Sequence, residues 1–314
     1  MLSRPIVREV IERNPVIDDV ILFDYKAKQN SMGRMWAMVR ELRARKFDLA
    51  ISFDRKLRPA LLCLFAGIPV RVGPSRVFED KPSRVTWLYT HTVPIAHDLE
   101  NTLQAETYQE IIRGFTGAQG HGRPVLPAPS TAECAKAATI LSSAGTRHKI
   151  GLCVKGTFGL KTWPKAYFAE VVRALHARYD AAFYLTGAPG DYAYAEEVID
   201  AIGLPVENLC GKTNLMELAA LYAQLDLLVT VDTGGAHIAA VTGVPMVVMF
   251  GCTSPRRWHP ISEHARAFTS NEPCCPCTYR ETECPSYPQP NCLYHVLPAV
   301  VTEACISYLE YDAE

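Results

Sequence analysis

Residues Leu225 to Pro255 read LDLLVTVDTGGAHIAAVTGVPMVVMFGCTSP, and this stretch decides the fold class. The apolar runs Leu227–Val231 and Val244–Phe250 predict two strands, and the small-residue segment between them predicts a helix. A strand, turn, helix and strand in this order form the repeating unit of an α/β protein with a mostly parallel sheet.

The turn Asp232-Thr233-Gly234-Gly235 joins the first of these strands to the helix that carries His237. The first backbone N–H groups of a helix have no partner within it and lie at the positive end of its dipole, so this turn suits a phosphate. Gly234 and Gly235 lack a Cβ and allow a ligand to approach closely. The alternative is an ordinary turn, with His237 hydrogen-bonded to a neighbouring residue.

The composition limits the class of protein. A chain of 314 residues, 48% of them hydrophobic, can bury one large core or two ordinary ones, and the alternating elements favour two. The formal net charge of -1 gives no electrostatic reason for nucleic acid to be the main partner. No apolar run reaches the roughly 18 residues of a membrane-spanning helix. Residues Met1–Pro5 do not begin an apolar signal segment, so we expect a cytoplasmic protein.

Strands and helices alternate along the whole chain in two α/β halves. The Gly/Pro/His-rich stretch 117–129 is the best linker candidate between them. The predicted strands cover residues 19–24, 47–53, 70–73, 149–154 and 182–186, besides the two strands of the opening stretch. The predicted helices cover residues 5–14, 32–45, 58–66, 97–114, 131–143, 164–179, 191–202, 215–225 and 298–309.

Four stretches of the second half carry motifs: Gly156-Thr157 with Lys161–Pro164, Gly187–Asp191, Cys210–Leu215 with Glu217-Leu218, and the opening stretch. They resemble motifs of glycosyltransferase family 9, in the family's order and approximate spacing. The best-known members of the family are the ADP-heptose:lipopolysaccharide heptosyltransferases. The resemblance implies an α/β protein of the GT-B type, with two Rossmann-like domains and parallel sheets, the first domain being incomplete. We expect an acceptor-side domain over residues 1–130, a nucleotide-sugar-binding domain over 131–298, and a C-terminal helix over 299–314 that packs back on the first domain.

The resemblance also implies the reaction. Such an enzyme transfers heptose, or a related sugar, from an ADP-sugar donor to a lipopolysaccharide core acceptor, and the departing diphosphate must be stabilised. Lys161 is the expected catalytic group, and with the helix dipole it can stabilise that charge, so we expect no metal and no cofactor. The expected substrate-binding residues are Thr157, Asp191, Thr213, Asp232, Thr233, Gly234, Gly235 and His237.

Several of these residues have a structural alternative. Asp232 is an acceptor that either holds sugar hydroxyls or orients the turn. Asp191 either binds ribose hydroxyls or caps the following helix. Thr213 either contacts the nucleoside or caps the helix that begins at Leu215. Without the family role, Lys161 would be an ordinary surface lysine. A Rossmann-type dehydrogenase is disfavoured because no G-x-G-x-x-G follows any predicted strand.

The first half departs from the family pattern at its start. Family members begin with a strand, a glycine-containing loop with an Asp, a helix and a second strand, and only then the segment that resembles residues 1–24. That Asp is the proposed general base, and no residue of this sequence inherits its role by motif. We therefore expect a gap or an exposed edge in the first sheet. Either the true protein contains the missing unit, or this chain is a degenerate relative that binds nucleotide sugar without efficient transfer.

Five cysteines gather in the Pro-rich stretch 271–292. A Cys-x2-Cys pair followed by two more cysteines is typical of tetrahedral zinc, but the second pair is spaced too widely for a second zinc knuckle. The alternatives are a structural zinc site or disulfide, and a compact surface loop of the kind that follows the F-G-x-T-x-P motif in family 9. The five residues are Cys274, Cys275, Cys277, Cys284 and Cys292.

A basic segment of the first half suggests a second partner. Its charges could face anionic core sugars or the surface of the inner membrane, to which the protein would then bind peripherally. The alternative is a solvated charged face. The residues are Lys26, Lys28, Arg34, Arg40, Arg43, Arg45 and Lys46.

Overall fold

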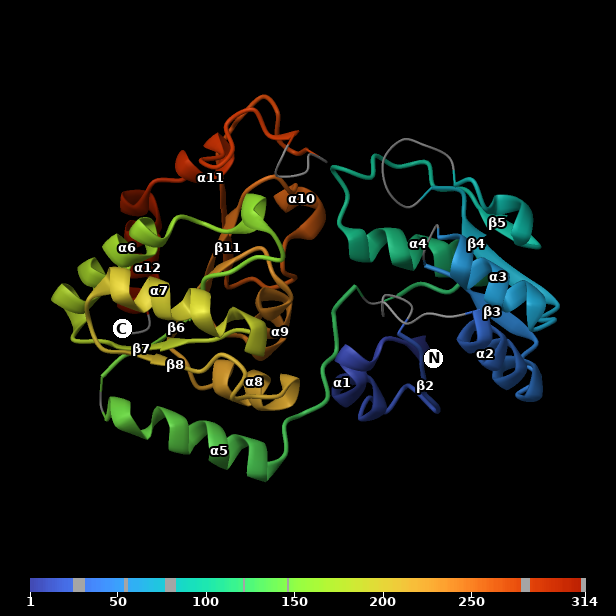
Figure 1. Ribbon diagram of the computed structural model, residues 1–314, viewed down its shortest axis with the longest axis horizontal. Coiled ribbons are helices and arrows are strands. Elements are labelled where there is room, and N and C mark those ends of the chain that lie inside the picture. Colours follow the sequence, from blue (N-terminus) through green and yellow to red (C-terminus); the bar gives the residue numbers. More distant parts are fainter. Residues whose placement is uncertain are drawn as a thin grey trace. The chain divides into compact units, whose positions relative to one another are not determined.

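The computed structural model describes residues 1–24, 32–53, 56–76, 83–120, 122–145, 147–277 and 283–311. The chain forms two compact units, one of residues 1–12 and 16–123 and the other of residues 13–15 and 124–314 (Figure 1). The change of unit after Arg123 falls inside the stretch 117–129, where we expected the linker. In the part of the chain that the structure describes, no helix is both long and apolar enough to cross a membrane.

The second unit is built on one parallel sheet of six strands, in the order β11-β10-β9-β6-β7-β8. Its strands are β6 (Lys149–Cys153), β7 (Ala182–Leu185), β8 (Val206–Asn208), β9 (Leu227–Val231), β10 (Met246–Phe250) and β11 (Ala265–Thr269). Its helices are α5 (Thr131–Leu141), α6 (Lys165–Tyr179), α7 (Tyr192–Ile202), α8 (Leu215–Tyr222), α9 (Gly234–Thr242), α10 (Pro255–Trp258), α11 (Asn291–Tyr294) and α12 (Pro298–Tyr311).

Helices cover both faces of this sheet, which explains the uninterrupted apolar strands of the opening stretch. Successive side chains of a strand point to opposite faces. Val229 and Val231 of β9 accordingly pack in the core that includes residues of α6, α7 and α12, whereas Leu228 packs in the core with residues of α5, α8 and α9. Full burial of one such side chain contributes about 1.5–3 kcal/mol, so the sheet holds the ends of its strands firmly in place.

The expectation that the last helix packs back on the first domain stays a prediction. Helix α12 belongs to the second unit, where it contacts α6, β9 and β10. The physical reason is the apolar stripe on α12. Val301, Cys305 and Leu309 recur at helical spacing and are buried in the core on that face of the sheet.

The described residues of the first unit form two smaller parallel sheets, β1-β2 and β3-β4-β5. The predicted helix at 97–114 is shorter in the structure, because the Asp98 carboxylate accepts the Glu100 N–H at 2.9 Å and holds a turn before α4 begins. The strands are β1 (Leu2–Ser3), β2 (Ile21–Leu22), β3 (Leu49–Ile51), β4 (Val70–Pro74) and β5 (His91–Val93). The helices are α1 (Arg8–Glu12), α2 (Met32–Ala44), α3 (Leu57–Phe65) and α4 (Gln104–Thr116).

Candidate functional site

The candidate site lies at the carboxyl edge of the six-stranded sheet. Strands β6 and β9 are neighbours in the sheet. After β6 the chain leads to β7 on one side of this pair, and after β9 it leads to β10 on the other side. The loops after β6 and β9 therefore diverge, and such a switch point is where open α/β sheets bind ligands. The two loops meet at their bases, where Cys153 Sγ lies 3.8 Å from Thr233 Oγ1.

Lys161 and Asp232 form an ion pair between these two loops. Lys161 Nζ lies 2.7 Å from Asp232 Oδ2, and the side chains are only 17% and 6% exposed. The Thr253 hydroxyl donates a second hydrogen bond to the same oxygen, at 2.6 Å. Asp232 was expected either to hold sugar hydroxyls or to orient the turn. The geometry favours the orienting role, because the carboxylate already accepts hydrogen bonds from the Lys161 ammonium and the Thr253 hydroxyl.

The start of α9 is capped at Gly235 and open at Gly234. The Thr233 hydroxyl accepts the Gly235 N–H at 2.9 Å and thereby caps the helix. A Cβ at Gly235 would lie 3.2 Å from the Tyr222 hydroxyl, so this glycine is closely packed. A Cβ at Gly234 would meet nothing within 4 Å, so its surface is open to a ligand.

His237 lies one turn into α9 and has an exposed ring. The protein atoms around its inner side partly desolvate the imidazole, and this desolvation lowers its pKa below the ordinary value. Asp232 opposes the shift, whereas Lys161 and His259 add to it. The ring is therefore near the ion pair, and at neutral pH it is an uncharged group that can both donate and accept.

Two motif glycines pack the loop after β6 into place. A Cβ at Gly156 would lie 2.5 Å from the Lys161 carbonyl oxygen, and a Cβ at Gly251 would lie 2.2 Å from the Leu160 carbonyl oxygen. Both approaches are too close for any other residue. The glycines of the first and fourth motifs thus allow the backbone to fold tightly around Lys161.

Asp191 is engaged by its surroundings. Its carboxylate accepts the Ala188 N–H at 3.0 Å and lies 3.2 Å from Lys155 Nζ, which also lies over the Tyr194 ring. Asp191 stands at the N-cap position of α7, but its side chain bonds backward to the turn and makes no capping hydrogen bond to that helix. Lys155 was absent from our sequence-based site. Its position directly after a strand end was the signal that could have revealed it.

Thr213 does not cap α8, which corrects the second capping alternative. Asn214 is the cap, since its side-chain oxygen accepts the N–H groups of Met216 at 3.0 Å and Glu217 at 2.8 Å. Glu217 accepts the Asn214 N–H in return, which completes a capping box. The half-buried Thr213 lies on the loop after β8, and the Gly211 N–H in that loop donates to the Gly187 carbonyl after β7.

The structure therefore places the expected residues in two groups at one edge. Lys161, Asp232 and the start of α9 lie together, with Thr157 exposed on the loop after β6. Asp191 and Thr213 lie on the loops after β7 and β8, which contact each other through their glycines. Thr253, like Lys155, was missed, although it stands inside the recognised F-G-x-T-x-P motif.

The cysteine-rich stretch contains no disulfide. None of the eleven cysteines, all of which lie among the described residues, is bonded to another, so the disulfide alternative is not present in this structure. Among the residues outside the gaps given above, no three or more Cys, His, Asp or Glu side chains are arranged for a metal ion. The stretch is held at two points, because the Cys277 N–H donates to the Cys252 carbonyl at 2.8 Å and Cys292 is buried in the core.

Comparison with known proteins gives a family and a fold. The model of glycosyltransferase family 9 (heptosyltransferase) matches residues 35–287. Lipopolysaccharide heptosyltransferase 2 of Escherichia coli K12 is 26% identical over 278 residues, which cover 82% of this chain and 75% of that protein.

Two solved structures have a similar fold. A family 9 glycosyltransferase from Veillonella parvula superposes with a TM-score of 0.80 at 21% identity, covering 99% of this chain and 88% of that one. E. coli heptosyltransferase WaaC with ADP superposes with a TM-score of 0.68 at 17% identity, covering 98% and 89%. These neighbours have the GT-B fold that the sequence motifs led us to expect.

Proposed function

Because this chain belongs to glycosyltransferase family 9, the heptosyltransferase family, we propose that it transfers heptose, or a related sugar, from an ADP-sugar to a lipopolysaccharide core acceptor. One observation carries the proposal. The Lys161–Asp232 pair, with 2.7 Å between Nζ and Oδ2, lies beside the open start of α9 at the switch point of the sheet. Two relatives support the choice of substrates, one named for lipopolysaccharide and heptose and the other solved with ADP.

In the proposed reaction the bond between the sugar carbon and the diphosphate breaks, and negative charge gathers on the departing ADP. Lys161 is the group we assign to that charge, together with the first N–H groups of α9. Asp232 and Thr253 position the ammonium group, since the Lys161 ammonium and the Thr253 hydroxyl both donate to Asp232 Oδ2. Neutral His237 and Thr157 are assigned to hydrogen bonds with the donor sugar or phosphates.

The nucleoside half of ADP is assigned to the loops after β7 and β8. Thr213 is half-buried there and does not serve as a helix cap, which favours the ligand-contact interpretation. Asp191 is held by Lys155 and Ala188, so we propose that the Lys155–Asp191 pair acts as one unit toward the ribose hydroxyls.

The acceptor would be embedded in the inner membrane, so the reaction would take place at its cytoplasmic surface. Helix α2 supports this placement: Arg34, Arg40 and Arg43 are exposed along it, while Met38, Val39 and Leu42 are buried. An exposed basic face is attracted to anionic lipid. Lys26 and Lys28, which belong to the same basic segment, lie outside the described residues.

The alternative is a family member that binds the nucleotide sugar without efficient transfer. The described strands of the first unit fall into two separate sheets, whereas those of the second unit form one continuous sheet, and this difference favours the alternative. A single-turnover assay with ADP-heptose and a core oligosaccharide distinguishes the two. Release of ADP that depends on the acceptor supports transfer, and binding without release supports the alternative.

Calorimetry of ADP with the full chain tests the donor site. A Cβ at Gly234 points into open space, so Gly234→Ala is expected to leave stability unchanged while raising the Kd for ADP about tenfold by occupying the phosphate position. Asp200→Asn, on the exposed side of α7, is the matched control and should bind ADP like the wild type. The donor-site proposal fails if the wild-type chain does not bind ADP, or if Gly234→Ala binds it equally well.

A further inference from the structure

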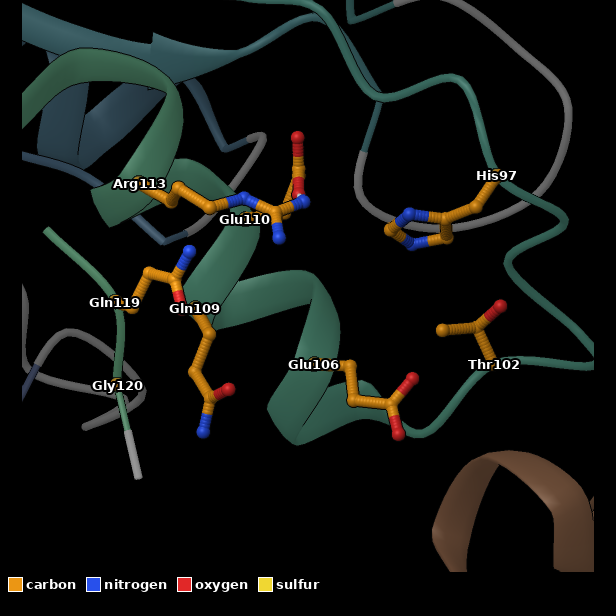
Figure 2. A pocket seen from close by; sticks show the side chains of 8 residues that line it. All are labelled: His97, Thr102, Glu106, Gln109, Glu110, Arg113, Gln119 and Gly120. Carbon is orange, nitrogen blue, oxygen red and sulfur yellow. The ribbon is translucent and has the colours of Figure 1, made fainter. Parts of the chain in front are cut away.

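A polar pocket of about 390 Å³ lies within the first unit (Figure 2). This volume falls in the range of about 300–1,000 Å³ that is usual for small-molecule sites. Three segments form its walls: the chain after β5, one face of α4, and the chain after α4. The described lining residues are His97, Thr102, Glu106, Gln109, Glu110, Arg113, Gln119 and Gly120.

The pocket lies at a position that the fold favours for ligands. His97 and Thr102 follow the carboxyl end of β5, and parallel sheets bind ligands beyond these ends. Glu106, Glu110 and Arg113 are spaced by four and three residues, so α4 presents them on one face. Figure 2 shows the His97 ring and the Glu110–Arg113 pair pointing toward each other from opposite sides of the pocket.

The charges of the lining select against an anionic ligand. Among the described lining residues, Arg113 is the one guanidinium or ammonium group, and it is paired with Glu110. Glu106 adds a second carboxylate with an exposed side chain. A phosphate or carboxylate entering the pocket would meet more negative than positive charge.

The polar groups suit hydroxyls instead. Carboxylates accept hydrogen bonds from hydroxyl groups, and the Gln109 and Gln119 amides both donate and accept. No described lining residue has an aliphatic side chain, which disfavours an acyl chain. The His97 ring is held in place, because its Nε2 lies 3.0 Å from the hydroxyl of fully buried Thr107.

We propose that this pocket binds a neutral sugar ring of the acceptor glycan through Glu106, His97 and the Gln109 amide. The inference rests on the proposed function, because the acceptor of a glycosyltransferase is the source of such a ring. It adds a position for that ring inside the first unit and a preference for neutral over phosphorylated sugar.

The test is binding of methyl heptoside, and of the same heptoside carrying a phosphate, to the full chain by saturation-transfer NMR titration. We expect Glu106→Gln to raise the Kd for the neutral heptoside about tenfold, since a charged acceptor is lost. His97→Ala is a second variant, and Asp200→Asn in the second unit is the control of equal charge change. ADP binding is measured on the same samples and should be unchanged in all three variants.

The outcomes separate this inference from the proposed function. Heptoside binding that Glu106→Gln and His97→Ala leave unchanged overturns the inference, as does tighter binding of the phosphorylated probe. Wild-type protein that binds ADP but no heptoside also overturns it and leaves the donor-site proposal standing. Heptoside binding lost in both variants supports the pocket, even if ADP does not bind and the proposed function fails.

Discussion

At the scale of single residues, the candidate site depends on how one carboxylate is shared. Asp232 Oδ2 receives the Lys161 ammonium at 2.7 Å and the Thr253 hydroxyl at 2.6 Å, with both charged side chains largely buried. A buried charge is costly unless it is paired and hydrogen-bonded. The pair therefore holds the cation at a fixed place beside α9, where a departing diphosphate would need it.

Removing Lys161 should damage stability as well as activity. In Lys161→Met the Asp232 carboxylate keeps only the Thr253 hydroxyl among its hydrogen bonds described above, and breaking such a buried pair costs on the order of 3 kcal/mol. Denaturant unfolding measures the loss. The double variant Lys161→Met/Asp232→Asn should recover most of the stability but none of the transfer activity. Full activity in the double variant would exclude Lys161 from the reaction.

The titration of His237 should follow its surroundings. Desolvation lowers its pKa below the ordinary value of about 6.5. Because the pKa of His237 is lower in the folded state, the unfolded chain binds the proton at a higher pH than the folded chain does. The contribution of His237 to stability is therefore present above about pH 6.5 and is lost as the pH falls through the pKa of the folded state. NMR titration of His237 should give a midpoint below the ordinary value of about 6.5, and His237→Gln should flatten the pH dependence of unfolding between about pH 5 and 7. A midpoint at or above about 6.5 would contradict the assignment.

At the scale of elements, glycine contacts hold the site loops together. The Gly156 backbone lies against Lys161, Gly251 lies against the Leu160 carbonyl, and the Gly211 N–H donates to Gly187. Gly211 also has a φ of +74°, which favours glycine. Neighbouring loops at the sheet edge are thus fastened backbone to backbone, which leaves their side chains available for a ligand.

The start of α8 gives a prediction at this scale. Asn214 caps the helix and Thr213 does not, so Asn214→Ala should lower the free energy of unfolding by about 1 kcal/mol. Thr213→Ala should leave stability nearly unchanged and weaken ADP binding instead. Chemical denaturation and calorimetry of the two variants check this division. Equal destabilisation by both would restore Thr213 as a cap.

At the scale of the whole molecule, the two units differ in how much core they bury. Two large cores cover both faces of the six-stranded sheet, while the described residues of the first unit form three smaller clusters around short strands. Local stability follows the density of buried apolar contacts. The proposed donor site thus lies in the unit with the higher expected local stability, and the proposed sugar pocket lies in the unit with the lower one.

Hydrogen exchange should show this difference. Amide protons of β6, β9 and β10 are expected to exchange at least tenfold more slowly than those of β3 and β4. These central strands of the six-stranded sheet exchange only when the whole second unit unfolds. Saturating ADP should slow exchange further in the second unit, since a ligand stabilises the state that binds it. Mass spectrometry of peptic peptides measures both effects. Equal exchange rates in the two units would contradict the prediction that the second unit is locally more stable than the first.

The sequence by itself determined the features that depend on neighbours along the chain. Apolar runs, turn glycines and helix caps are local patterns, so Leu225–Pro255 predicted β9, α9 and β10 in their order. The motifs were sufficient for the family and the GT-B class, which the comparisons confirmed. Roles for individual residues, such as Thr157 and His237, remain predictions.

Only the tertiary structure decided which distant groups meet. Lys161 and Asp232 are 71 residues apart, and their contact follows from β6 and β9 being neighbours in the sheet. No local pattern encodes strand order, so the same motifs could not reveal that Asp232 holds Lys161, that Lys155 holds Asp191, or that α12 packs on the second unit. These pairings depend on which buried faces fit together, and that is a property of the packed chain.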